Sequence, residues 1–189
     1  MQKVDTDKHD GDLVLRDNSI SRGIDQLVNL IGAVFSWLWL VLLCVIILNV
    51  VLRYVFHQGM IELEELQWYL YAVAWLVGLS YTFIADGHVR VDVVFERLSF
   101  RKQLWLELLG LLLLFLPFVC FVMYYCLPFV ELSWQTNERS TSANGLGARW
   151  LIKGFLLFSF FLLFLVGFSR LLRVVSSLKH GPAPLTAEH

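Results

Sequence analysis

Charge and cysteine are both scarce in this sequence. Only 16% of its 189 residues are charged and the formal net charge is -1, so the chain has no basic surface of the kind that binds nucleic acid. The three cysteines, Cys44, Cys120 and Cys126, all fall within apolar runs. Their odd number and their positions argue against a disulfide framework, and their spacing is not that of a metal site. They are expected to be buried apolar residues.

Ionisable side chains are also missing from the centres of the long apolar runs. Glu107 and Lys153 fall within about one helical turn of a run's end, and Asn49 is the main amide. Because charges inside a membrane usually mark ion or proton pathways, the chain shows no transport path of its own. His57 and His88 lie at run ends, so no histidine pair is placed to ligate a haem. We therefore expect a non-catalytic protein that binds no cofactor.

Apolar residues are what the sequence has in abundance, at 58%. Four runs stand out, at about 28–52, 66–85, 104–127 and 151–172. About twenty residues at a rise of 1.5 Å each cross a bilayer core, so the runs predict an all-α integral membrane protein with four transmembrane helices. Residues 1–18 are expected to be a disordered polar segment, 19–178 the membrane domain and 179–189 a polar tail.

Two shorter segments have the pattern of amphipathic helices on the membrane surface. One covers residues 20–31, after a predicted N-cap near Asn18, and is either an interfacial helix that runs into the first span or the frayed start of that span. The other covers residues 88–102, whose basic residues bind anionic lipid or a partner subunit, or simply anchor the loop. Pro117 predicts a kink in the third span, either a hinge or a static bend.

Lysine and arginine set the expected orientation. Most of the 15 lie in the N-terminal segment, the middle loop and the C-terminal tail, which places both termini in the cytoplasm. The chain is therefore predicted to be a multi-pass membrane protein with two external loops. Only four basic residues fall on the other side, namely Arg53, Arg139, Arg149 and Lys153.

The second run carries a polar group at each end. Glu62, Glu64 and Glu65 precede it and either contact a partner or form a solvated helix start. Arg53 ends the first run on the same side, and we expect it to pair with Glu65 or, failing that, with Glu64. At the far end His88 lies between Asp86 and Asp92, where loop capping or subunit contact is expected rather than metal binding. Within the run, Ala74 and Gly78 form a small-residue step for helix packing.

The order and spacing of several motifs resemble one known family. They are Asn49 to Phe56 at the end of the first run, Glu65-Leu66, Trp75, Gly78 and His88 to Asp92 in and after the second, and Glu138-Arg139-Ser140, Gly145-Leu146 and Arg149 to Lys153 before the last. Over about residues 25 to 175 the chain resembles the small membrane subunit (DctQ-like) of tripartite ATP-independent periplasmic (TRAP) transporters. It departs from the pattern at Gly147, where a proline is common.

The resemblance implies partners and a division of labour. A large membrane subunit would hold the sodium ions and the substrate and work as an elevator, while a periplasmic binding protein delivers the substrate, often a small organic acid. The small subunit would brace the large one, help to form the docking surface, and contact membrane lipids. The candidate residues for partner contact or structural roles are Arg53, Glu62, Glu64, Glu65, Ala74, Gly78, His88, Arg90, Asp92, Glu138, Arg149 and Lys153.

The alternative is an autonomous four-helix membrane protein, such as a small transporter or the membrane anchor of an enzyme complex. Charged residues within the spans would favour that alternative. A neighbouring gene for a large hydrophobic permease would favour the resemblance instead.

The orientation predicts a labelling pattern. Single cysteines at Gln58 and Asn144 should react with a membrane-impermeant thiol reagent in intact spheroplasts, whereas one at Ser99 should not. The unmodified chain, whose cysteines lie in apolar runs, is the blank. Labelling at Ser99 alone would reverse the orientation.

Overall fold

All secondary-structure elements in the described part of the chain are helices. The structure is a computed structural model, and it describes residues 18–85, 98–142 and 145–180. The elements are α1 (Ser19–Tyr54), α2 (Ile61–Ile84), α4 (Phe100–Leu109), a π-helical segment η1 (Gly110–Phe115), α5 (Leu116–Gln135) and α6 (Arg149–His180). These ranges contain no strand, so the prediction of an all-helical protein is confirmed for them.

The first helix starts where the sequence predicts. Asn18 is the N-cap, and its backbone N–H donates to Ser21 Oγ at 3.0 Å. Residues 20–31 belong to the same uninterrupted 36-residue helix as the first expected span, which agrees with either alternative for this segment. At 1.5 Å per residue α1 is about 54 Å long, which exceeds the roughly 30 Å hydrocarbon core of a bilayer.

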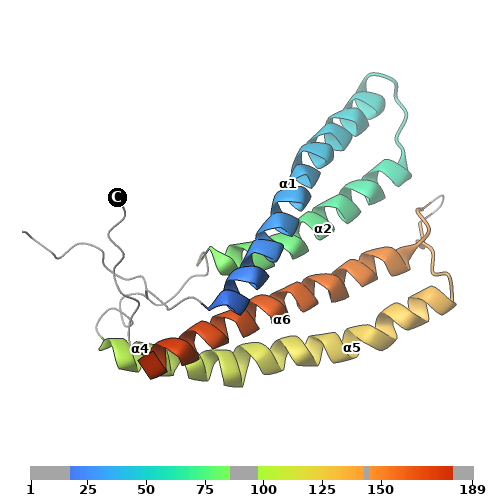
Figure 1. Cartoon of the computed structure of the whole chain (residues 1–189). Coiled ribbons are helices and arrows are strands. Elements are labelled where there is room, and N and C mark those ends of the chain that lie inside the picture. The colour runs from blue at the N-terminus through green and yellow to red at the C-terminus, as the bar shows by residue number, and fades with distance from the viewer. Residues whose placement is uncertain (1–17, 86–97, 143–144, 181–189) are drawn as a thin grey trace, which may run out of the picture.

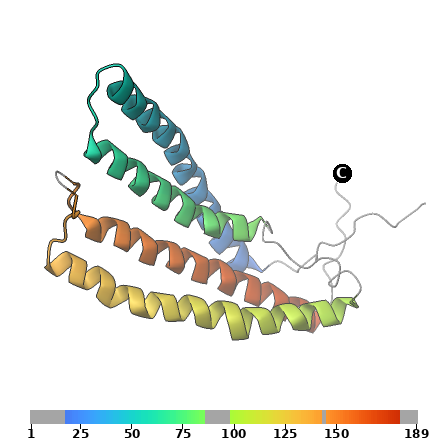
Figure 2. The same ribbon diagram turned by 180° about the vertical axis from the view of Figure 1, so that it is seen from behind.

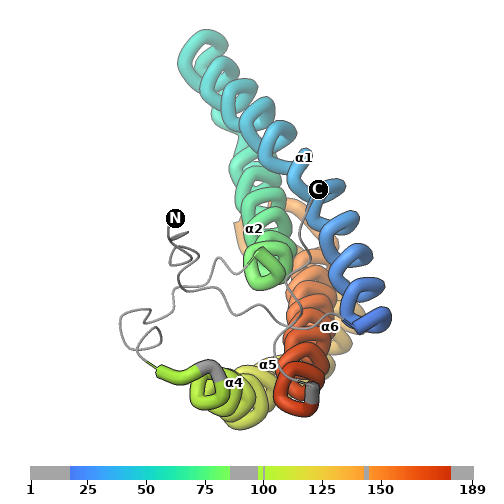
Figure 3. Tube along the Cα trace, turned by 60° about the vertical axis from the view of Figure 1, so that its left-hand side comes forward, coloured from blue at the N-terminus to red at the C-terminus, as the bar shows by residue number. Residues whose placement is uncertain are grey.

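Two helical hairpins make up the bundle, and α6 is the helix that joins them. It packs against α1 and α2 on one side and against α4, η1 and α5 on the other. Figures 1 and 2 show α1 and α2 diverging from the α5–α6 pair towards the α1–α2 connection. We call that end the loop end. The opposite end, where α1 starts and α6 finishes, is the terminal end, which Figure 3 shows most directly.

The buried core lies away from the loop end of the first hairpin. One cluster joins α1, α2 and α6 through Val28, Val77, Leu162 and Val166. A second joins α4, η1 and α6 through Leu104, Leu111 and Val174. The most apolar window of α1 is only 6% buried within the chain. Most of its apolar surface must therefore face lipid or another protein.

Three helical stretches are long and apolar enough to cross a membrane: Ser19–Tyr54, Arg101–Gln135 and Arg149–Lys179. These correspond to the first, third and fourth predicted spans. The helix α2 is not among them, because its two Trp and three Tyr residues lower its mean hydropathy. Its 24 residues nevertheless give a length of about 36 Å, and the second of the four expected spans stays a prediction.

The expected break at Pro117 takes the form of a π-helical segment. Proline has no N–H and clashes with the carbonyl four residues earlier, and η1 ends two residues before Pro117. The wider turn brings Phe115 onto Gly167, where an added Cβ would lie 2.3 Å from Phe115 Cε1. The ring of Phe115 also packs on Phe83, with centroids 4.7 Å apart. This packing favours a static bend over a hinge.

The third span was expected to end at Pro128, but α5 continues through that residue to Gln135. Contacts on the C-terminal side of the proline account for the difference. The ammonium of Lys153 lies 3.8 Å from the centre of the Phe129 ring, and Trp134 packs edge-on against Trp150 at 4.4 Å. Interactions with α6 thus hold the last turns of α5 despite the missing backbone hydrogen bond.

Two ion pairs fasten α6 to its neighbours at the terminal end. Arg173 pairs with Asp25 of α1, and Arg170 pairs with Glu107 of α4. The side chains of Arg170 and Glu107 are only 11% and 10% exposed. Ser169 Oγ adds a hydrogen bond of 2.9 Å to Asp25 Oδ1. These pairs are not among the expectations drawn from the sequence, although two arginines three residues apart on one helix face are a visible signal.

Replacing one residue of the Asp25–Arg173 pair should destabilise the bundle more than replacing both residues. Asp25→Asn or Arg173→Met strands the other half-buried charge, at a cost of about 3–5 kcal/mol, while the double variant should recover part of that loss. Unfolding in detergent would measure the three variants against the unmodified chain. Strictly additive effects would show that the pair is not coupled.

Candidate functional site

The carboxylate of Glu65, at the start of α2, is held by the loop between α5 and α6. The hydroxyl of Ser140 donates to its Oε1, and the backbone N–H of Leu146 donates to its Oε2 at 2.6 Å. The loop approaches closely at Gly145, where an added Cβ would lie 2.4 Å from Ser140 Cβ and 3.0 Å from Glu65 Oε1. Glycine at this position therefore permits the carboxylate to reach the loop.

The same loop is fastened to the start of α6. Lys153 Nζ lies 2.5 Å from Glu138 Oε2, and Arg149 lies 3.9 Å from the other carboxylate oxygen. Arg149 also donates to Ser140 Oγ at 3.4 Å, which links the two groups of contacts. We call Glu65, Glu138, Ser140, Arg149 and Lys153 the loop-end cluster. It joins α2, the α5–α6 loop and α6.

Hydrogen bonding favours the charged form of both carboxylates in this cluster. The hydroxyl of Ser140 and the N–H of Leu146 lower the pKa of Glu65 below its ordinary value of 4.5. The ammonium of Lys153 lowers the pKa of Glu138 in the same way. Since ionised carboxylates bound by several donors are poor proton acceptors, the cluster is suited to a structural role.

Arg53 pairs with Glu64, not with Glu65. The guanidinium of Arg53 donates to Glu64 Oε1 at 3.2 Å, whereas Glu65 is taken up by the loop. The first choice of partner was wrong and the second is confirmed. Adjacent helix residues point about 100° apart, so only one of the two carboxylates can face α1. Both side chains of the pair are about half exposed, which limits its contribution to about 0–1 kcal/mol.

The small residues of α2 do not share one environment. Ala74 is 3% exposed and packs inside the chain, whereas a Cβ added to Gly78 would meet no atom within 4 Å. The close helix approach occurs instead at Gly32 of α1, where an added Cβ would lie 3.0 Å from the Tyr81 ring. Gly78 thus opens onto a groove, and its predicted role in helix packing stays a prediction.

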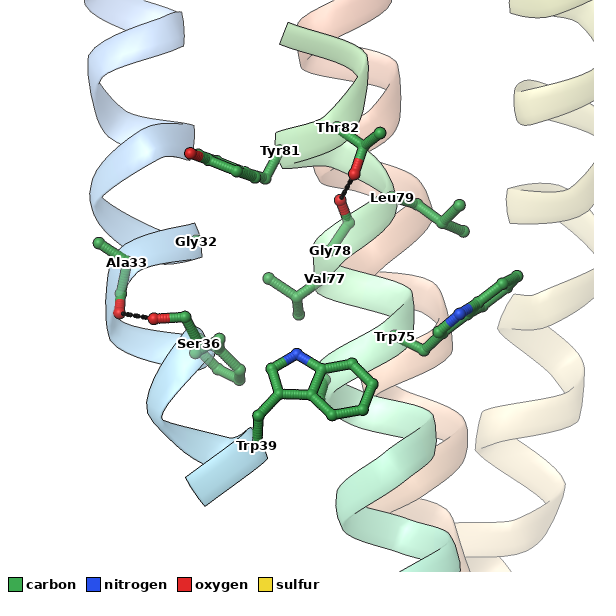
Figure 4. A pocket seen from close by; sticks show the side chains of 12 residues that line it. Gly32, Ala33, Ser36, Trp39, Trp75, Val77, Gly78, Leu79, Tyr81 and Thr82 are labelled. Carbon is green, nitrogen blue, oxygen red and sulfur yellow. Dashed lines mark hydrogen bonds between the residues drawn. The ribbon is translucent and has the colours of Figure 1, made fainter. Parts of the chain in front are cut away.

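That groove runs along the seam between α1 and α2 and has a volume of about 720 Å³. Figure 4 shows Trp39 and Trp75 at one end of it and Tyr81 at the other. The hydroxyls of Ser36 and Thr82 donate to carbonyls of their own helices, at 2.7 and 2.9 Å. The groove is therefore a mainly apolar surface, and the hydroxyls of Ser36 and Thr82 on it are already bonded.

The other predicted site residues fall in two groups. Glu62 is half-buried in the first turn of α2, where with Glu64 it complements the helix dipole. His88, Arg90 and Asp92 lie outside the described residues. Ser140 and Leu146 were seen only as part of a sequence motif, and the structure shows that they bind Glu65.

The part of the chain that holds these residues matches a known protein family. A family model described as "Tripartite ATP-independent periplasmic transporters, DctQ component" matches residues 42–177, which is more than half of the chain. The matched segment includes the whole loop-end cluster and the groove wall formed by α2. A search of curated proteins finds no match.

The contact between Glu65 and the loop should depend on pH. A lowered pKa means that the contact is complete above pH 4.5 and is lost as the pH falls through the lowered value. Spin labels at Met60 and Thr141 would report the separation of α2 from the loop. The distance should grow on acidification in the unmodified chain and be enlarged at every pH in Glu65→Gln.

Glu64→Gln is the matched control, because it removes the neighbouring carboxylate, which pairs with Arg53. It should keep the acid transition. A transition that persists in Glu65→Gln would assign it to Glu138, whose pKa is also lowered, and would contradict the role of Glu65.

Proposed function

This chain belongs to the DctQ family of tripartite ATP-independent periplasmic transporter components, and from that membership we propose that it is the small membrane subunit of a sodium-coupled secondary transporter. It braces a large elevator-type subunit during the uptake of small organic acids. The sodium and substrate sites belong to the large subunit, and this chain binds no cofactor. The family match over residues 42–177 is the observation that carries the proposal.

The distribution of burial supports a bracing role. The most apolar windows of the three candidate spans are only 6%, 11% and 22% buried within the chain. Lipid covers part of this surface, and a large membrane partner covers the rest. The ion pairs at the terminal end and the loop-end cluster hold the helices in one arrangement against that partner. A subunit with both ends fastened is suited to remain still while the large subunit moves.

The loop end is proposed to face the periplasm of a bacterial inner membrane, and both termini the cytoplasm. The helix α2 is then the second of four membrane spans. In that orientation Glu62 and the half-exposed Glu64 lie where a substrate-binding protein docks. The loop-end cluster contributes by fixing the height of the α5–α6 loop relative to α2, which keeps the docking surface in one shape.

The second candidate is an autonomous four-helix membrane protein, such as a small transporter. The charged residues at the terminal end are the feature that would favour it. Charged residues near a span can line a transport path. Here Arg170 and Arg173 each have a carboxylate partner, and Asp25 is also bonded to Ser169. Paired and hydrogen-bonded charges of this kind join helices together, so we favour the accessory subunit.

Two assays separate the candidates. The tagged chain should bring down a large membrane subunit from solubilised native membranes, and the purified chain alone should give no sodium-dependent uptake in proteoliposomes. Proteoliposomes that contain this chain together with the large subunit and the binding protein should show sodium-dependent uptake. Robust uptake by the purified chain would disprove the accessory role.

A further inference from the structure

A second groove lies on the α1–α2 seam, nearer to the loop end than the one in Figure 4. Its volume is about 440 Å³. Trp39 and Tyr71 mark the boundary between the two grooves, with ring centroids 5.9 Å apart. The second groove is lined by Leu42, Ile46, Asn49, Val50, Arg53, Tyr54, Glu64, Gln67, Trp68 and Tyr71.

Two carboxamides in this groove have unmet hydrogen-bonding groups. Asn49 is only 7% exposed, and its Oδ1 has no hydrogen-bond partner. The Nε2 of Gln67, on the facing helix, also has none. Asn49 lies one turn below Arg53, about 6 Å deeper, and Gln67 lies one turn below Glu64. At that depth water is scarce, so an unpaired amide is costly.

The chemistry of these two groups defines what would fill the groove. An acyl chain offers no hydrogen bond, and the ester groups of a phospholipid only accept. A hydroxyl or carboxamide side chain both donates and accepts. The terminal torsion of Asn and Gln is broad, so a modest rotation turns either amide towards such a group. Ile46 and Val50, which are 38% and 48% exposed, supply an apolar wall beside the amides for a helix to pack on.

We propose that this groove receives a transmembrane helix of the large subunit, which carries a Ser, Thr, Asn or Gln side chain about one turn below its outer end. That side chain bonds to Asn49 and Gln67, and the helix packs on the apolar wall beside them. The inference rests on the proposed function. It adds the contact surface and the chemistry of the partner residue, neither of which the family match supplies.

Replacing each amide by a residue of similar size tests the groove. Asn49→Leu and Gln67→Leu remove the polar groups while keeping the bulk. Each should lower recovery of the large subunit by about three- to tenfold, because the loss of one interhelical hydrogen bond weakens the affinity by about that factor. The thermal stability of the isolated variants should be equal to or above that of the unmodified chain, because an unpaired buried amide is lost.

Gln135→Leu is the matched control, because this exposed amide already donates to Glu131 at 3.0 Å. It should leave recovery unchanged. If both groove variants recover the large subunit as well as the unmodified chain does, the inference is wrong and the proposed function stands. If the unmodified chain recovers no large subunit, the proposed function fails and the inference fails with it.

A photocrosslinking amino acid placed at Trp68 or Tyr71 in the full complex identifies the occupant without altering the amides. An adduct to a membrane helix of the large subunit is expected. Adducts to phospholipid, or to a second copy of this chain, would each show a different occupant and overturn the inference.

Discussion

The pairing of two arginines on α6 with carboxylates on α1 and α4 is the constraint on which the bundle depends. The last third of α6 supplies both Arg173 and Arg170. Their partners lie on two helices that are far apart in the sequence, Asp25 on α1 and Glu107 on α4. All four side chains are largely buried, so each charge requires its partner. The two apolar clusters are built on the same central helix, which therefore orders both hairpins.

The loop end is held differently. No apolar cluster joins the outer half of α1 to α5 and α6 within the described residues, and the hairpins diverge there (Figure 1). One carboxylate, Glu65, carries the connection between α2 and the α5–α6 loop. The chain is thus held by buried ion pairs at the terminal end and by the loop-end cluster at the other, while α1 and α2 leave two grooves along the seam between them. The two grooves of this seam give the chain a contact surface that it does not fill itself.

The same arrangement suits the polar residues of the loop-end cluster and of the terminal end to a structural role. The acidic groups of the loop-end cluster and of the terminal end are bonded to hydroxyls, a backbone N–H, guanidinium groups or an ammonium. The hydrogen bonds at Glu65 and Glu138 lower the pKa of both carboxylates, which favours their charged, bonded forms.

The sequence by itself determined the helical class, the three long apolar helices, the N-cap at Asn18 and the family, because these depend on local pattern and on motif order. It also named Glu65, Glu138, Arg149 and Lys153 as candidates without showing that they meet. Only the tertiary structure decided that Glu64, and not Glu65, faces Arg53, and that Asp25 meets Arg173 across 148 positions. Composition and periodicity show that a residue is polar and near a helix end. Which neighbour it bonds depends on how the helices are rotated and packed, and that is fixed by contacts between distant parts of the chain.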